Sequence, residues 1–172
     1  MQLRILLVFL ACCLTGNSYA TDSDSAFTLY LVRHAEKQVD GSRDPALTGA
    51  GKLRAEQLAT GLKDKGITAI WSSDYKRTRS TAQPLLAELG LELNIYDPGN
   101  QALLVGQLLA RQSTTLIVGH SNTIPELARL LCERPIAEMD ETEYDRLIVI
   151  SVNDENIQVK TLQQSNLFQT QN

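Results

Sequence analysis

The two histidines of the chain stand in equivalent places, each close behind an apolar, strand-like run. His34 follows Arg33 after the run Phe27–Val32, and His120 comes just behind the run Thr114–Val118. An arginine–histidine pair is poor core material, because burying a charge costs several kcal/mol, ~3–5 for an unpaired ion. Open α/β sheets bind their ligands at the carboxyl ends of strands. We therefore expect both histidines to face one site.

Basic residues are predicted at the same edge of the sheet, where the strands have their carboxyl ends. Lys76, Arg77 and Arg79 open the helix expected after the second strand. A helix N-terminus attracts anions, and the planar fork of arginine matches phosphate oxygens. Taken singly, Arg33 fits a surface ion pair, His34 a satisfied core histidine and the basic cluster a solvated helix face. Their shared placement favours a site for a compact dianion, of which phosphate is the obvious candidate.

The elements that must position these residues alternate along the chain. Strand-like runs cover residues 27–32, 67–71, 91–96, 114–118, 146–152 and 156–162. Helical patterns lie between the first four, and a further one begins near Pro125. Alternation of this kind predicts one α/β domain of three layers, with a mostly parallel sheet covered by helices on both faces. The last two runs predict a closing antiparallel hairpin.

Local signals set the expected helix ends. Thr48 is a candidate cap for the first helix, and Ser73 or Asp74 for the second. Pro84 falls inside the second helical pattern, where proline kinks a helix or starts a new segment.

Four segments resemble one known family in the order that the family has them. They are Leu31–Glu36, Asp44–Gly51, Ser72–Thr78 and Val118–Asn122. The first resembles the Arg-His-Gly/Ala signature of the histidine phosphatase superfamily, which has the phosphoglycerate-mutase-like fold. One such motif is a weak match, but four in order span nearly the whole of residues 21–172.

The resemblance implies a role for each matching residue. His34 is expected to be the nucleophile that becomes phosphohistidine, Arg33 and Arg77 to bind phosphate, and His120 to contact the phosphoryl oxygens. Neutral imidazole is a competent nucleophile near pH 7 and needs no metal. We therefore expect a metal-independent phosphomonoesterase without a cofactor, acting on a small phosphorylated substrate such as a sugar phosphate.

The proton donor is the open point of this pattern. The mutase branch carries an acidic donor after the second arginine, and residues 89–104 show no clear match. Glu36 is the candidate catalytic acid, with a salt bridge to Lys37 or Arg43 as the alternative. Asp97 is a second candidate, and a turn residue is its alternative reading.

Other function classes stay open at this stage. A catalytically silent phospholigand-binding domain would keep the pocket without the reaction. A phosphohistidine protein phosphatase is favoured by size, whereas an exported branch that acts on phosphorylated lipopolysaccharide-core sugars suits export better. His34, Glu36 and His120 could instead hold a metal, but the neighbouring arginines would repel a cation.

Residues 1–20 read as a secretory signal. Arg4 precedes the apolar stretch Ile5–Leu14, and Ser18–Ala20 resembles a cleavage site. Cleavage after Ala20 would leave residues 21–172 as the phosphatase domain in the periplasm or secreted. Lipoprotein processing at Cys12, an uncleaved anchor and a buried helix are the alternatives.

Composition limits the partners. The apolar stretch Ile5–Leu14 is too short to span a bilayer, which needs about 20 apolar residues, so no stable membrane insertion is expected. The formal net charge of −4 and the absence of a basic run argue against nucleic acid. After cleavage Cys132 would be alone, which leaves no intramolecular disulfide and favours a small core residue.

Overall fold

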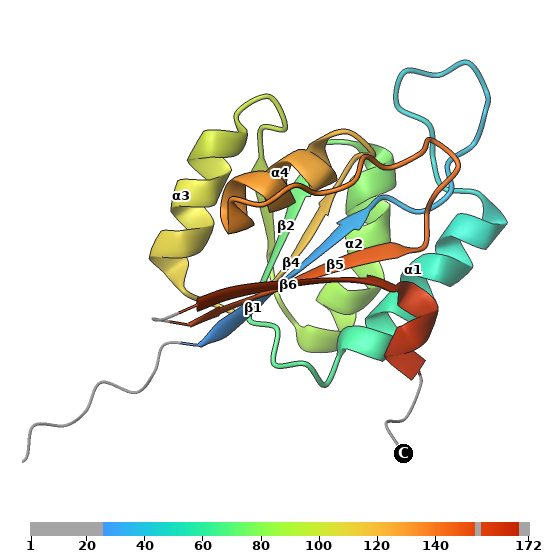
Figure 1. Cartoon of the computed structure of the whole chain (residues 1–172). Coiled ribbons are helices and arrows are strands. Elements are labelled where there is room, and N and C mark those ends of the chain that lie inside the picture. The colour runs from blue at the N-terminus through green and yellow to red at the C-terminus, as the bar shows by residue number, and fades with distance from the viewer. Residues whose placement is uncertain (1–25, 154–155, 169–172) are drawn as a thin grey trace, which may run out of the picture.

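A six-stranded sheet with the strand order β3-β2-β4-β1-β5-β6 forms the centre of the molecule (Figure 1). The computed structural model describes residues 26–153 and 156–168. The predicted signal segment and its alternative site at Cys12 lie outside these residues. In chain order the elements are β1 (Phe27–Arg33), α1 (Gly49–Leu62), β2 (Ala69–Ser73), α2 (Lys76–Leu89), β3 (Leu93–Tyr96), α3 (Gln101–Arg111), β4 (Thr115–Gly119), α4 (Thr123–Cys132), β5 (Arg146–Asn153), β6 (Asn156–Gln163) and a 3₁₀ helix (Gln164–Phe168).

The sheet is parallel on one side and antiparallel on the other. β1, β2, β3 and β4 pair in parallel, whereas β5 pairs antiparallel with both β1 and β6. The predicted three-layer α/β fold, with a mostly parallel sheet and a closing antiparallel hairpin, is therefore confirmed. Because the parallel strands all end at one edge, their following loops meet there.

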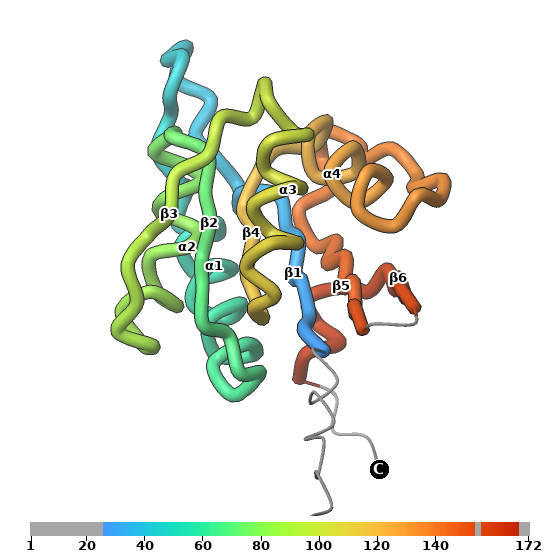
Figure 2. The backbone as a smooth tube through the Cα atoms, turned by 90° about the vertical axis from the view of Figure 1, so that its left-hand side faces the viewer, coloured from blue at the N-terminus to red at the C-terminus, as the bar shows by residue number. Residues whose placement is uncertain are grey.

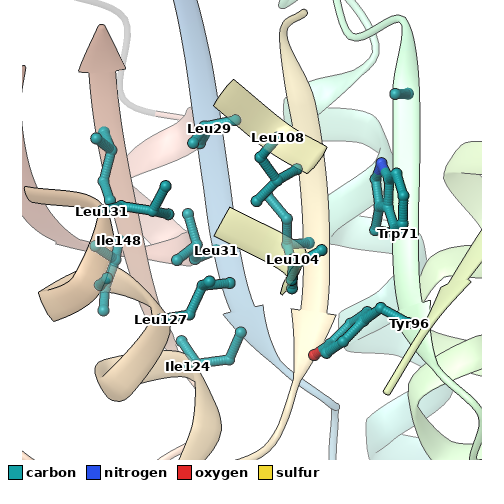
Figure 3. Close-up of a cluster of buried hydrophobic side chains, with 14 of the residues drawn as sticks. Leu29, Leu31, Trp71, Tyr96, Leu104, Leu108, Ile124, Leu127, Leu131 and Ile148 are labelled. Carbon is teal, nitrogen blue, oxygen red and sulfur yellow. The ribbon is translucent and has the colours of Figure 1, made fainter. Parts of the chain in front are cut away.

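Helices cover both faces of the sheet, as Figure 2 shows from the side of α3 and α4. Leu104 and Leu108 of α3 and Leu127 of α4 pack on one face against Leu29 and Leu31 of β1 (Figure 3). On the other face, α1 and α2 bury a second apolar cluster against β1, β2, β4 and β5. Burial of an aliphatic side chain contributes about 1.5–3 kcal/mol, so the two layers hold the strand ends in place.

The second strand runs two residues further than its apolar pattern predicts. Ser72 and Ser73 are fully buried within β2, and α2 begins only at Lys76. The expected cap from Ser73 or Asp74 is therefore wrong. The carboxylate of Asp44, in the loop before α1, instead accepts a hydrogen bond from the backbone N–H of Lys76 at 2.8 Å.

Two other expectations concern the helices. Thr48 caps α1, because its side chain accepts a hydrogen bond from the N–H of Gly51. Pro84 lies inside α2 without ending it, and the helix continues to Leu89.

Cys132 ends α4 as a buried free thiol, as expected for a core residue. Within the described ranges, none of the helices combines the length and hydrophobicity needed to cross a bilayer.

Candidate active site

The pairing of β1 with β4 brings the two histidines together. Arg33 lies opposite Gly119 in the register, and the N–H of His34 donates to the carbonyl of Gly119 at 2.9 Å. The imidazole rings of His34 and His120 then stand edge to face, with centroids 5.6 Å apart. A side chain at position 119 would collide with Tyr96 and Ile124. A larger residue would therefore displace these buried side chains at the point where β4 leads into His120.

The hydrogen bond of His34 defines which nitrogen is free. Its Nδ1 lies 2.8 Å from the carbonyl oxygen of Ala35. A carbonyl oxygen only accepts, so Nδ1 carries the proton and Nε2 keeps its lone pair. Because His34 lines the pocket, this lone pair belongs to the one atom of the ring that can act as a nucleophile there.

His120 takes the opposite tautomer. Nη2 of Arg77 lies 3.5 Å from its Nδ1, and a guanidinium only donates. The proton therefore sits on Nε2, which donates to the hydroxyl of Ser73 at 2.9 Å. Ser73 in turn hydrogen-bonds Thr78 at 3.1 Å. The buried end of β2 and the first turn of α2 thus orient this second histidine.

Both histidines are uncharged at neutral pH. The pKa of His34 is lowered to about 4, mainly by burial, with smaller contributions from Arg33 and Arg77 and against the opposing effect of its hydrogen bond to Ala35. Burial likewise lowers the pKa of His120 to about 4, with the same two arginines as secondary causes. The positive charge of the site therefore comes from arginine and lysine side chains, and the imidazoles stay neutral.

Arg77 has unused hydrogen-bonding capacity. Its Nε and Nη1 are buried and have no hydrogen-bond partner, although Nη1 lies 3.6 Å from a carboxylate oxygen of Asp44. The guanidinium stacks on the ring of Tyr75, 4.4 Å from the centroid. A rigid cation with free donors beside two neutral histidines is suited to bind an anion.

Arg33 is placed differently. Only 1% of it is exposed, and its Nη1 donates to the carbonyls of Asp140 and Glu143 at 3.0 and 3.2 Å. Its Nη2 forms an ion pair with Glu141 at 2.8 Å. The guanidinium also covers the ring of Tyr144. Arg33 therefore ties the turn before β5 to the site, and Nε is its remaining unpaired donor.

A cavity of about 430 Å³ opens where these elements meet. Its walls hold three cationic side chains, Arg33, Lys37 and Arg77, against one carboxylate, Glu141. The other lining residues are His34, Tyr75, Pro98, Gly99, His120, Ser121, Asn122 and Thr123. Its charge balance favours an anionic ligand.

The two acids considered from the sequence do not line this cavity. Both oxygens of Glu36 accept hydrogen bonds from Arg54, the shortest at 2.7 Å, and the pair is half-buried. The hydrogen bonds and charge of Arg54 hold the pKa of Glu36 low against the burial of the carboxyl, the largest single influence, which raises it. Neither Lys37 nor Arg43 is its partner. Asp97 is exposed and accepts a hydrogen bond from the N–H of Gly99, as a turn residue does.

Sequence reasoning missed several residues of the cavity. Glu141 comes from the loop between α4 and β5, which had no recognisable motif. Its carboxylate accepts a hydrogen bond from the hydroxyl of Ser121, the residue directly after His120. Tyr75 was visible only as part of the third motif. No cluster of three or more potential metal ligands occurs among residues 26–153 and 156–168.

Comparison with known proteins finds sequence similarity over part of the chain. Residues 29–98 match the sequence pattern of the histidine phosphatase superfamily (branch 1). Proteins described as probable phosphoglycerate mutase GpmB, from Escherichia fergusonii and Escherichia coli O1:K1, are 38% identical over 100 residues. The match covers 55% of this chain but only 46% of either relative, so the chain spans about half their length.

Solved structures are similar over most of the chain. The protein histidine phosphatase SixA, complexed with tungstate, superposes with a TM-score of 0.67 at 18% identity, covering 82% of this chain and 99% of that one. Mycobacterial glucosyl-3-phosphoglycerate phosphatase gives 0.65 at 17% identity, with coverages of 80% and 98%. The alpha-ribazole phosphatase of Shigella flexneri gives 0.62 at 19%, with coverages of 80% and 96%. At these identities the likeness concerns the fold.

Proposed function

The chain belongs to the histidine phosphatase superfamily, and we propose that it hydrolyses phosphomonoesters through a phosphohistidine formed on His34. The observation that carries this proposal is the 2.8 Å contact between Nδ1 of His34 and the carbonyl oxygen of Ala35, which fixes the tautomer of the ring. Its Nδ1–H is committed to the carbonyl of Ala35, which leaves the Nε2 lone pair on a buried, neutral ring at the cavity.

The first step is attack of Nε2 on the phosphorus atom. A nitrogen–phosphorus bond forms while the bond to the leaving oxygen breaks, and charge spreads over three equatorial oxygens. The buried free donors of Arg77 are suited to stabilise that charge, and so is the remaining donor of Arg33, while His120 lines the same cavity. Water then attacks the phosphohistidine and releases inorganic phosphate.

The substrate that fits this site is small and strongly anionic. The cavity of about 430 Å³ has room for a phosphoryl group and one sugar-sized remainder. Glucosyl-3-phosphoglycerate phosphatase and alpha-ribazole phosphatase, two of the similar structures, are named for small phosphorylated substrates. We therefore propose a sugar phosphate or a similar compact phosphomonoester as the substrate, with no cofactor.

Export belongs to the same proposal. The basic residue, apolar stretch and small-x-small ending of residues 1–20 support a cleaved signal and a periplasmic or secreted enzyme. Mass spectrometry of the protein recovered from the expressing cells should place its N-terminus at Thr21. A lipid-modified N-terminus at Cys12 would instead indicate a membrane-anchored form.

The activity is tested with a panel of phosphomonoesters in the presence and absence of EDTA. We expect turnover that survives the chelator, and loss of that turnover in His34→Ala. Full activity of His34→Ala would contradict the assignment of the nucleophile. Binding of inorganic phosphate without turnover of any ester would favour the silent phospholigand-binding domain.

A further inference from the structure

The reaction leaves one chemical requirement without an assigned group. When the phosphorus–oxygen bond breaks, an alkoxide leaving group needs a proton in the same step, because a free alkoxide is a very poor leaving group. Arginine cannot supply it, since its guanidinium does not lose a proton in proteins. Glu36 is held by Arg54 and does not line the cavity.

Resting on the proposed phosphatase function, we propose that Glu141 is the catalytic acid and base of this site. Among the described residues that line the cavity, it is the single carboxylic side chain. It lies in the loop between α4 and β5, which passes the carboxyl end of β1 in Figure 1. No motif of the sequence marks it.

The carboxylate is connected to both histidine-bearing segments. Its Oε2 pairs with Nη2 of Arg33, directly before His34, at 2.8 Å. Its Oε1 accepts a hydrogen bond from the hydroxyl of Ser121, directly after His120. A phosphoryl group bound between the two histidines therefore lies within side-chain reach of this carboxylate.

The backbone of the turn is fixed, whereas the side chain of Glu141 is open to solvent. Arg33 holds the carbonyls of Asp140 and Glu143 on either side of Glu141, and the Asp140 carboxylate accepts a hydrogen bond from the N–H of Thr142 at 2.8 Å. In contrast, 77% of the Glu141 side chain is exposed. An exposed carboxyl on a fixed turn can exchange its bonds to Arg33 and Ser121 for one to the leaving oxygen without moving the turn.

Substrate binding changes the electrostatics of this group in the required direction. In the free protein, the hydrogen bond from Ser121 and the charge of Arg33 lower the pKa of Glu141 and keep it ionised. A phosphate dianion next to it repels the carboxylate and competes for the same arginine. Both effects favour the protonated acid when substrate is bound.

Glu141 would lose a proton in the first step of the reaction and regain one in the second. In the first step Nε2 of His34 bonds to phosphorus, the ester oxygen departs, and the Glu141 carboxyl gives its proton to that oxygen to form the alcohol. In the second step a water oxygen bonds to phosphorus and displaces Nε2, while the Glu141 carboxylate takes a proton from that water. Ester and water are consumed, alcohol and phosphate are formed, and the protein is unchanged.

The test compares two leaving groups in the full-length protein. Glycerol phosphate releases an alkoxide that needs a proton, whereas p-nitrophenyl phosphate releases a phenolate that does not. In Glu141→Gln we expect kcat/KM to fall about 10²- to 10³-fold for glycerol phosphate but less than about tenfold for p-nitrophenyl phosphate. Retained turnover of the second substrate also shows that the variant is folded.

The matched control is Glu138→Gln, an exposed acid of the same loop that pairs with Arg129. It should leave both rates unchanged. Equal losses for both substrates in Glu141→Gln, or no loss for either, would overturn the assignment of Glu141 alone. An inactive wild-type protein would instead overturn the proposed phosphatase function and the proton transfer with it.

Discussion

Two arginines reach the same cavity from different elements, and they are used in opposite ways. Arg33, at the end of β1, gives one guanidinium nitrogen to two backbone carbonyls and another to Glu141. Arg77, in the first turn of α2, keeps two buried nitrogens without hydrogen-bond partners. The comparison separates a cation that holds the site together from one that is reserved for the ligand.

This contrast follows from what surrounds each guanidinium. An unpaired buried donor costs about 1–3 kcal/mol of stability in the free protein. A bound anion that accepts hydrogen bonds from the donor recovers this cost. Arg77 bears that cost beside Tyr75 and His120. Arg33 is almost completely satisfied, so its removal should affect folding as well as function.

The largest effect is expected for Arg77→Ala. Loss of a donor aimed at transition-state charge typically lowers kcat about 10²- to 10³-fold, and we expect kcat/KM to fall by about 10³-fold here. The midpoint of urea unfolding should hardly change, because few bonds are lost. Arg79→Ala, which breaks only an exposed ion pair with Asp74 in the same helical turn, is the control. A strongly destabilised Arg77→Ala would erase the contrast between the arginines.

Arg33→Ala should lower stability more than any other change at the cavity. It leaves the carbonyls of Asp140 and Glu143 and the Glu141 carboxylate without their donor, which we expect to cost about 3 kcal/mol. Urea unfolding at neutral pH measures this loss. Arg129→Ala, which removes an exposed pair with Glu138, should change stability by under about 1 kcal/mol. Equal effects of the two changes would contradict the structural role of Arg33.

The pH dependence of stability reports mainly on the burial of the two histidines beside these arginines. The folded pKa values of His34 and His120 are about 4, below the ordinary 6.5. Between these values the unfolded chain binds protons that the folded chain does not, so the free energy of unfolding falls as pH drops from about 6.5 towards 4. Above about 6.5 the two histidines add no pH dependence. Urea unfolding should show a shallower decline in His34→Asn, and an unchanged slope would argue against a buried neutral His34.

The smallest effect is expected for Glu36→Gln. Arg54 keeps its ion pair with Asp145 when the charge of Glu36 is removed, so the change should cost only about 1 kcal/mol. Glu36 also lies outside the cavity lining. We expect kcat/KM to stay within about twofold of wild type. A loss as large as that of Glu141→Gln would return the role of proton donor to Glu36.

The sequence predicted the parts of the site that depend on local patterns. His34 and His120 follow apolar strands, and parallel pairing of those strands brings them to one edge. Arg77 was placed correctly beside them because its helix starts at the same edge. Each of these inferences needs only the end of one element and the general geometry of a parallel sheet.

Contacts between residues far apart in the chain could not be predicted from the sequence. Arg33 meets the carbonyl of Asp140 across 107 residues, and no local pattern tells where the loop before β5 folds back. Glu141 was therefore missed, and Glu36 was considered because it stands two residues after His34. Ser73 was assigned to a cap since serine favours helix starts, whereas its pairing with His120 depends on the sheet order.

The most direct test of the central claim is to trap the phosphoenzyme. A radiolabelled phosphomonoester is mixed with the protein, the reaction is quenched within milliseconds, and the labelled peptide is identified. Because the chain has only two histidines, the result is unambiguous. The account predicts acid-labile label on His34, absent from His34→Ala. Label on His120 or on a hydroxyl side chain, or turnover without any trapped label on His34, would contradict it.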